Sequence, residues 1–438
     1  MIRRDRTPPV AKITGLRRVI ELLKDLLIIL LTCSAILLAW QTPMVTHLRG
    51  WVAPPVQSAV PESRQSGGAV VPYAICARNE LGLYGVSYDD TLVGRTFERF
   101  SPLLGEALAT AGEARRITWS AFRALLEAPG VYCSLQGEPP LSAISALLGG
   151  ESAPEGNASA LVLAWDGSRV LLGWRSGDLY YEAPTQVAYQ GHLDDALSEF
   201  SPNSAAFAYA LAETDPVYGV LDPWVLASMA APRPLVYSAA FPDLAGDSAA
   251  LEQLLGDLGF LSGVDAAYET PVGLAITENG DRLQVSSAGA VTFRAGEESR
   301  FPVSTAGERP TAAEAAHSAW DLLDRTVQTW EGAGAFVLTG VTASADGWTV
   351  TFHSRLDGIP VLTGENGWSA RFVIEGRKIS DFTLFLRLYT ATEETSVIPS
   401  DRLAAAAMAS MPGSGGALTL FYRDNLGATV SAGWRAGE

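Results

Sequence analysis

Apolar and polar positions alternate in short runs through much of the chain, and turn residues separate the runs. Residues 161–183 read LVLAW-DG-SRVLLGW-RSG-DLYYEA, three runs rich in β-branched and aromatic residues. Asp-Gly and Ser-Gly lie between the runs, a pattern that predicts a three-stranded antiparallel meander. Residues 273–293 show the same pattern with Asn-Gly and Ala-Gly at the turns. The two stretches therefore predict two meanders and a weak internal repeat.

Helical periodicity is clearest after Pro310, where apolar residues recur three and four positions apart as far as Trp330. Because proline suits a first helical turn, an amphipathic helix is predicted at residues 310–330. Similar patterns predict helices at residues 102–111, 118–127, 141–148, 194–200, 248–258 and 400–411. Short β-rich runs predict further strands at residues 73–77, 83–88, 217–221, 235–237, 336–342, 348–353, 360–362, 369–374, 378–388, 418–422 and 428–434. Antiparallel meanders with flanking helices correspond to the α+β fold class.

A charge-free run, LLIILLTCSAILLAW, occupies residues 26–40. At about 1.5 Å per residue the run is shorter than the roughly 30 Å hydrocarbon core, so its flanks must extend the predicted membrane helix to residues 19–45. Seven basic residues precede the run, which predicts a cytoplasmic N-terminus and an extracellular body. A cleaved signal peptide is the rival interpretation, but the run ends in the bulky Trp40 without a small-residue cleavage pair.

Charge distinguishes the two ends of the chain. The net charge is -17 at pH 7, but residues 1–25 hold seven basic and three acidic residues, so the remainder carries -21. Nucleic-acid affinity depends mainly on neutralising phosphates with clustered Lys and Arg, which an acidic body does not offer. The composition therefore predicts no nucleic-acid partner.

Length predicts several folded units. The chain has 438 residues, whereas single hydrophobic cores stop growing at about 250 to 300 residues. Two or three extracytoplasmic α+β domains are expected to follow the membrane helix. The predicted order is a basic cytoplasmic tail at 1–18, a transmembrane signal-anchor helix at 19–45, a Pro/Ser/Gly linker at 46–72, a first α+β domain at 73–204, a second at 205–305 and a C-terminal α+β domain at 306–438.

Common catalytic motifs are missing from the sequence: it has no H-E-x-x-H, G-x-S-x-G, S-x-x-K, Walker A loop or strand-linked G-x-G-x-x-G. His317 and Asp321 are neighbours on a predicted helix, but two groups do not make a zinc site. The pair Asp89 and Asp90 could bind a cation, yet no calcium-loop pattern follows, and solvated charge is the simpler interpretation. His353 is expected at a surface or sheet edge. No catalytic, cofactor-binding or metal-binding residue is predicted.

Two cysteines, Cys76 and Cys133, fall in the predicted extracellular body. Oxidising conditions outside the cell permit a disulfide between them. Each also lies in a strand-like run, VPYAICA and VYCSLQ, so two buried free thiols explain them equally well. The sequence leaves both alternatives open.

Two Gly-punctuated stretches carry a family resemblance. Residues 277–295 read TENGDRLQVSSAGAVTFRA, and residues 350–386 read VTFHSRLDGIPVLTGENGWSARFVIEGRKISDFTLFL. Together with the basic tail, the single membrane helix and the size of the body, they resemble the YycH/YycI family, most clearly over residues 270–434. Members are membrane-anchored extracytoplasmic regulators of WalK (YycG), the histidine kinase of a cell-wall two-component system in Gram-positive bacteria. The C-terminal domain is accordingly expected to be YycI-like.

The resemblance implies a non-catalytic, single-pass cell-membrane protein that regulates a WalK-like sensor kinase through membrane-helix and extracellular contacts. It also implies a second YycH/YycI-type protein as a partner. Small and hydroxylated residues favour helix packing in lipid, so partner contacts are expected at Thr32, Cys33, Ser34 and Ala35, unless the helix is an ordinary anchor. The alternative function is an exported cell-wall hydrolase or ligand-binding protein, which predicts a cleft with convergent polar residues.

Overall fold

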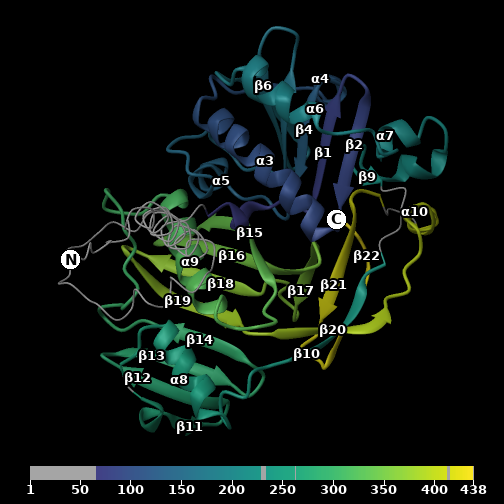
Figure 1. Ribbon diagram of the computed structural model, residues 1–438. Coiled ribbons are helices and arrows are strands. Elements are labelled where there is room, and N and C mark those ends of the chain that lie inside the picture. The colour runs from purple at the N-terminus through teal and green to yellow at the C-terminus, as the bar shows by residue number, and fades with distance from the viewer. Residues whose placement is uncertain (1–65, 228–232, 262, 412–414, 438) are drawn as a thin grey trace, which may run out of the picture. The chain divides into compact units, whose positions relative to one another are not determined.

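The computed structural model describes residues 66–227, 233–261, 263–411 and 415–437 (Figure 1). The predicted tail, the predicted membrane helix and most of the linker fall at residues 1–65, outside the described residues, as do Thr32, Cys33, Ser34 and Ala35. Within the described ranges, none of the helices has both the length and the apolar character needed to cross a membrane.

The first lobe is built on a seven-stranded sheet in the order β2-β1-β4-β5-β6-β7-β3. Every neighbouring pair in it is antiparallel. Its strands are β1 (Ala74–Asn79), β2 (Gly82–Ser87), β3 (Arg115–Ile117), β4 (Gly130–Ser134), β5 (Ala160–Trp165), β6 (Val170–Ser176) and β7 (Leu179–Pro184). The meander predicted at residues 161–183 is confirmed as β5, β6 and β7.

Helices cover both faces of this sheet. One face packs against α3 (Asp90–Ala109), α5 (Leu141–Leu147) and α6 (Asp194–Ser198), and the other packs against α4 (Trp119–Glu127). The second face is also covered by residues 206–227, which hold β8 (Ala206–Phe207), α7 (Ala208–Leu211), η4 (Pro216–Val220) and β9 (Leu226–Ala227).

Two local predictions in this lobe differ from the structure. The helix expected at residues 102–111 begins at Asp90 instead, because the Asp89 carboxylate caps it by accepting from Leu92 N at 2.9 Å. The strand expected at residues 217–221 is wrong. Asp215 caps a 3-10 helix there that begins at Pro216, and a proline fixed near φ of about -65° suits that first turn.

The second lobe is built on a thirteen-stranded sheet, with the strand order β11-β12-β13-β14-β19-β18-β16-β17-β21-β22-β10-β20 and β15 paired to β16. Its strands are β10 (Leu235–Ala240), β11 (Tyr268–Thr270), β12 (Gly273–Glu278), β13 (Asp281–Ser286), β14 (Ala290–Arg294), β15 (Ala335–Ala343), β16 (Gly347–Leu356), β17 (Ile359–Thr363), β18 (Ala370–Glu375), β19 (Lys378–Phe385), β20 (Leu388–Thr395), β21 (Leu418–Asp424) and β22 (Thr429–Ala436). The meander predicted at residues 273–293 is confirmed as β12, β13 and β14. Since β14 pairs with β19, strands of the second and third predicted domains share one sheet.

Among the described residues of this lobe, the α-helices are α8 (Ser248–Asp257), α9 (Ala312–Val327) and α10 (Asp401–Ala409), and η5 (Val264–Ala266) is a short 3-10 helix. The helix predicted at residues 310–330 is confirmed as α9, and a capping box between Thr311 and Glu314 fixes its start. Together the two sheets and their helices confirm the α+β fold class, and the sheets are antiparallel except for the parallel pair β17 and β21.

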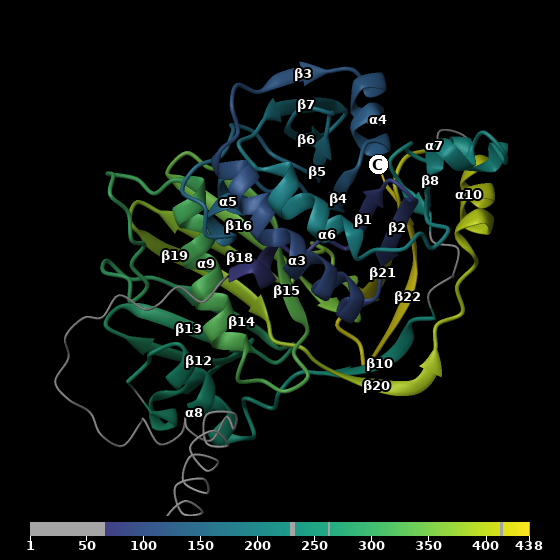
Figure 2. The ribbon, with the colours of Figure 1, turned by 45° about the horizontal axis from the view of Figure 1, so that its top comes forward.

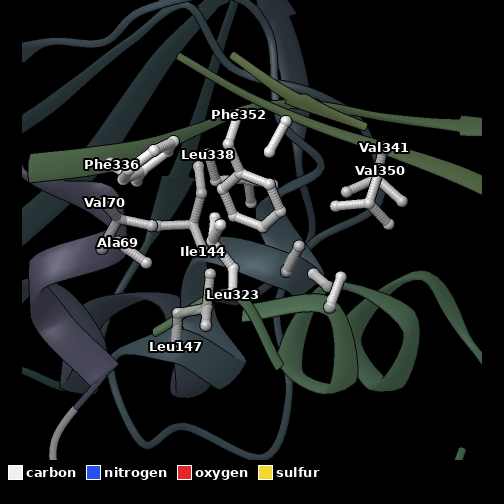
Figure 3. Close-up of a cluster of buried hydrophobic side chains, with 14 of the residues drawn as sticks. Ala69, Val70, Ile144, Leu147, Leu323, Phe336, Leu338, Val341, Val350 and Phe352 are labelled. Atoms are coloured by element: carbon white, nitrogen blue, oxygen red, sulfur yellow. The ribbon is translucent and has the colours of Figure 1, made fainter. Parts of the chain in front are cut away.

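The two lobes share one hydrophobic core, where α5 packs against α9 (Figures 1 and 2). Figure 3 shows Ile144 and Leu147 from α5 beside Leu323 from α9, under Leu338 and Phe352 of the second sheet. The short helix η2 (Ser66–Val70) adds its last two residues to the same cluster. Burying apolar surface stabilises a fold by about 25 cal/mol per Å². The apolar side chains that both lobes bury in this shared core therefore hold the lobes together.

Candidate interaction groove

A groove with a volume of about 460 Å³ opens where the two lobes meet. Its size lies within the range of about 300 to 1,000 Å³ that is common for ligand sites. It is lined by Pro140, Ser142, Ala153, Pro154, Glu155, Gly156, Asn157, Ala312, Val341, Thr342, Ala343 and Trp348. Residues from both lobes are therefore needed to form it.

The first wall consists of the start of α5 and the loop at residues 153–157. Backbone hydrogen bonds hold the loop against the segment before α5: Leu141 N donates to Gly156 O at 2.9 Å, and Ala158 N donates to Pro139 O at 3.0 Å. The Ser145 hydroxyl also donates to Ser152 O at 2.6 Å. These bonds give the wall a defined backbone conformation although it contains no long helix or strand.

The second wall consists of the end of β15, the start of β16 and the first residue of α9. Ala343 and Trp348 face each other across the two strands. The Trp348 ring is half-buried, and its Nε1 donates to Pro310 O at 2.8 Å, just before α9 begins. This bond fixes the indole against the helix and leaves part of the ring for the groove.

The lining is mostly neutral. Within the described lining, Glu155 carries the one ionisable side chain, and it is exposed. Ser142, Asn157 and Thr342 add hydroxyl and amide groups, while Trp348 and the prolines add apolar surface. Such a lining can bind an uncharged ligand or peptide segment through hydrogen bonds and apolar contacts.

An ion pair between a buried arginine and an exposed aspartate joins the two lobes at the far end of β16. The Arg355 guanidinium, 4% exposed, pairs with the Asp90 carboxylate at the start of α3. It also donates to Pro72 O at 3.2 Å and, over a longer 3.4 Å, to Val71 O. Burial lowers the pKa of Arg355, and the Asp90 charge opposes that shift. This arginine therefore connects the second sheet to the first lobe.

The Asp-Gly turn after Arg355 completes the same junction. Gly358 has φ +79°, and a Cβ there would lie 3.0 Å from Asp90 N, so a side chain would be strained and would press against the start of α3. The Asp357 carboxylate accepts a hydrogen bond from Tyr237 OH, and Leu420 N donates to the Tyr88 hydroxyl at 3.1 Å. The turn at Asp357 and Gly358 is thus part of the contact between the lobes.

The structure separates the two cysteines. In the described part of the chain, Cys76 and Cys133 are both free and buried. On the antiparallel neighbours β1 and β4, Ile75 faces Cys133 while Cys76 faces Tyr132. Facing residues share one side of a sheet, so the two thiols point to opposite sides and a disulfide would need the strands to be rebuilt. Burial raises the pKa of Cys133 to about 12 and that of Cys76 well above its usual value.

The other residues considered from the sequence have local roles. His317 Nε2 lies 3.3 Å from Asp321 Oδ2 on α9, as predicted from their spacing. Asp89 and Asp90 are not simply solvated, since one caps α3 and the other binds Arg355. His353 is half-buried on β16, which pairs with β15 on one side and with β18 and β17 on the other, so the edge alternative is wrong. Within the described ranges, no three His, Cys, Asp or Glu side chains are grouped as metal ligands.

Comparison of the chain with protein-family models, with curated proteins and with solved structures finds no match in any of the three.

Proposed function

We propose that this chain is a non-catalytic regulatory protein, anchored in the cell membrane, that binds a sensor histidine kinase and adjusts its activity. The proposal combines the sequence resemblance, the charge pattern around residues 26–40 and the interlobe groove. In it, the membrane helix brings the two proteins together, and the groove supplies the extracellular contact.

The groove lining is the observation that carries the binding role. Its neutral hydroxyl and amide groups, its proline surface and the half-buried Trp348 are suited to holding a partner segment. Aromatic side chains with one polar end are common anchors in protein interfaces. The groove also spans both lobes, so a bound partner would contact the two sheets at once.

Reconstitution with a WalK-like sensor histidine kinase from the same organism tests the proposal. The full chain and the kinase are placed in the same nanodiscs, and kinase autophosphorylation is measured with and without the chain. We expect a change in the autophosphorylation rate. Co-purification should survive truncation of the body better than replacement of residues 26–45 by an unrelated membrane helix.

Two results would contradict this proposal. One is a kinase whose autophosphorylation and co-purification are indifferent to the full chain. The other is a purified chain that hydrolyses cell-wall glycan or peptide and loses that activity when a single Asp, Glu or His is replaced, which would support the alternative of an exported hydrolase.

A further inference from the structure

Strand β15 is paired along one side and only partly covered along the other. Among the described strands it pairs with β16 alone. The second edge is covered over the first part of the strand, as far as Thr339. There η2 packs against it, and Glu138 N donates to Thr339 O at 3.1 Å. Beyond Thr339 this edge borders the groove at Val341, Thr342 and Ala343. No described strand or isolated bridge pairs with it there.

The hydrogen-bond ladder determines which backbone groups face the groove. Ser344 N donates to Gly347 O at 2.9 Å, so these residues form a hydrogen-bonded pair. Bonded and non-bonded pairs alternate in an antiparallel ladder, which makes Thr342 the next bonded residue. Val341 and Ala343 therefore direct their N–H and C=O groups away from β16. Four backbone groups at the groove are in the geometry that an added strand requires.

We propose that the groove binds an extended peptide segment of a partner protein, which adds to the free edge of β15 as a strand and carries a basic side chain. The inference rests on the proposed function only in taking the partner to be an extracellular protein. Strand addition supplies affinity through main-chain hydrogen bonds, and alternate side chains supply specificity.

The lining indicates the side chains of this peptide. Successive side chains of a strand point to opposite sides, so one set would contact Trp348 and Ala312 and the other would approach the loop at residues 153–157. The Glu155 carboxylate favours Lys or Arg on the second side. The charge of -21 on the chain after residue 25 attracts such a segment at longer range.

Two other occupants fit the edge less well. The chain's own linker has prolines at positions 54, 55 and 61, and proline has no N–H to donate to a ladder. A second copy of the chain brings the same strong negative charge, which opposes its approach to Glu155. A basic segment from a different protein avoids both obstacles.

The test uses the full chain in nanodiscs and a phage-displayed library of random dodecapeptides. Selected peptides are synthesised, and their affinity is measured for the wild-type chain, Ala343→Pro, Ala343→Ser and Glu155→Gln. Ala343→Pro removes an outward N–H without breaking the ladder to β16, so affinity should fall by about tenfold or more. Ala343→Ser keeps that N–H and should bind normally. Glu155→Gln should weaken basic peptides by about threefold.

Hydrogen exchange gives a readout that does not depend on how the proline variant folds. In the free wild-type chain the Val341 and Ala343 amides should exchange quickly, while the Thr342 amide, bonded to β16, exchanges slowly. A bound peptide should protect the first two. Methylating alternate backbone nitrogens of the peptide should abolish both binding and protection in one register.

Several outcomes would overturn the inference: no enriched peptide, peptides that bind Ala343→Pro as well as wild type, or unchanged exchange at Val341 and Ala343. Protection of these amides in the free chain that disappears on deleting residues 52–61 would assign the edge to the linker. Protection that grows with protein concentration would assign it to a second copy. If any of these results is found and the chain still regulates the kinase, the peptide inference fails and the proposed function stands. If the groove binds peptides but the chain does not regulate the kinase, the proposed function fails and the peptide inference stands.

Discussion

Replacing Arg355 with methionine tests whether its ion pair with Asp90 joins the two lobes. The substitution keeps most of the side-chain volume but removes the charge and the hydrogen bonds to Asp90, Pro72 and Val71. Hydrogen bonds from a charged donor contribute about 1.5 to 3 kcal/mol each. Asp90 is 46% exposed and can be rehydrated, and the cost of burying the guanidinium disappears. The free energy of unfolding should therefore fall by about 2 to 3 kcal/mol, less than the sum of the lost bonds.

Chemical unfolding of the full chain in detergent, followed by tryptophan fluorescence, measures this change. The matched control is Arg294→Met, because Arg294 is 82% exposed and lies 4.0 Å from Asp381. Exposed pairs contribute about 0 to 1 kcal/mol, so this control should unfold almost like the wild type. If Arg355→Met and Arg294→Met unfold at the same denaturant concentration, the interlobe role of Arg355 is refuted.

Three further predictions concern buried or half-buried ionisable groups. Asp424→Asn should lower the free energy of unfolding by about 3 to 5 kcal/mol, because Arg387, bonded to both oxygens of this fully buried carboxylate, loses its counter-charge; chemical unfolding measures it. Burial lowers the pKa of His353 from 6.5 to about 4 in the folded chain. As the pH falls, this imidazole is therefore protonated in the unfolded chain before it is protonated in the folded chain. The resulting stability is present above pH 6.5 and is lost as the pH falls toward 4, and unfolding curves of His353→Gln should lack that part of the pH dependence. Cys76 and Cys133 should react with a thiol reagent only after unfolding, since both are buried with raised pKa values; an absorbance assay in native and denaturing buffer counts the thiols.

Local patterns predicted the meanders because alternation and turn residues lie within a single stretch of chain. β12 and β13 needed only their own sequence and the Asn279-Gly280 turn. The joining of β14 to β19 was not predictable in this way, because the partners lie far apart and each reads as an ordinary strand. The strand predicted at residues 217–221 is wrong because its apolar residues favour a strand, whereas Asp215 and Pro216 just before it favour the start of a helical turn.

The groove was beyond sequence reasoning for the same physical reason. Its walls come from residues near 155 and near 342, and nothing in either stretch indicates the other. Trp348 gives a weak indication of the groove. It follows the Asp346-Gly347 turn directly, so it lies at the start of a strand, and its aromatic ring has one polar group, the indole N–H. That no other described strand pairs with the second edge of β15 follows from the whole sheet, and a local sequence pattern does not contain this information.

Strand β16 connects the groove with the interlobe junction, since Trp348 lies near its start and Arg355 near its end. The opposite wall of the groove belongs to the first lobe, which Arg355 holds through Asp90. A peptide that contacts both walls therefore favours one arrangement of the lobes, and the ion pair favours one as well. Because coupling between two sites is reciprocal, Arg355→Met should change peptide affinity without touching the peptide. An affinity equal to that of the wild type would mean that groove and junction act independently.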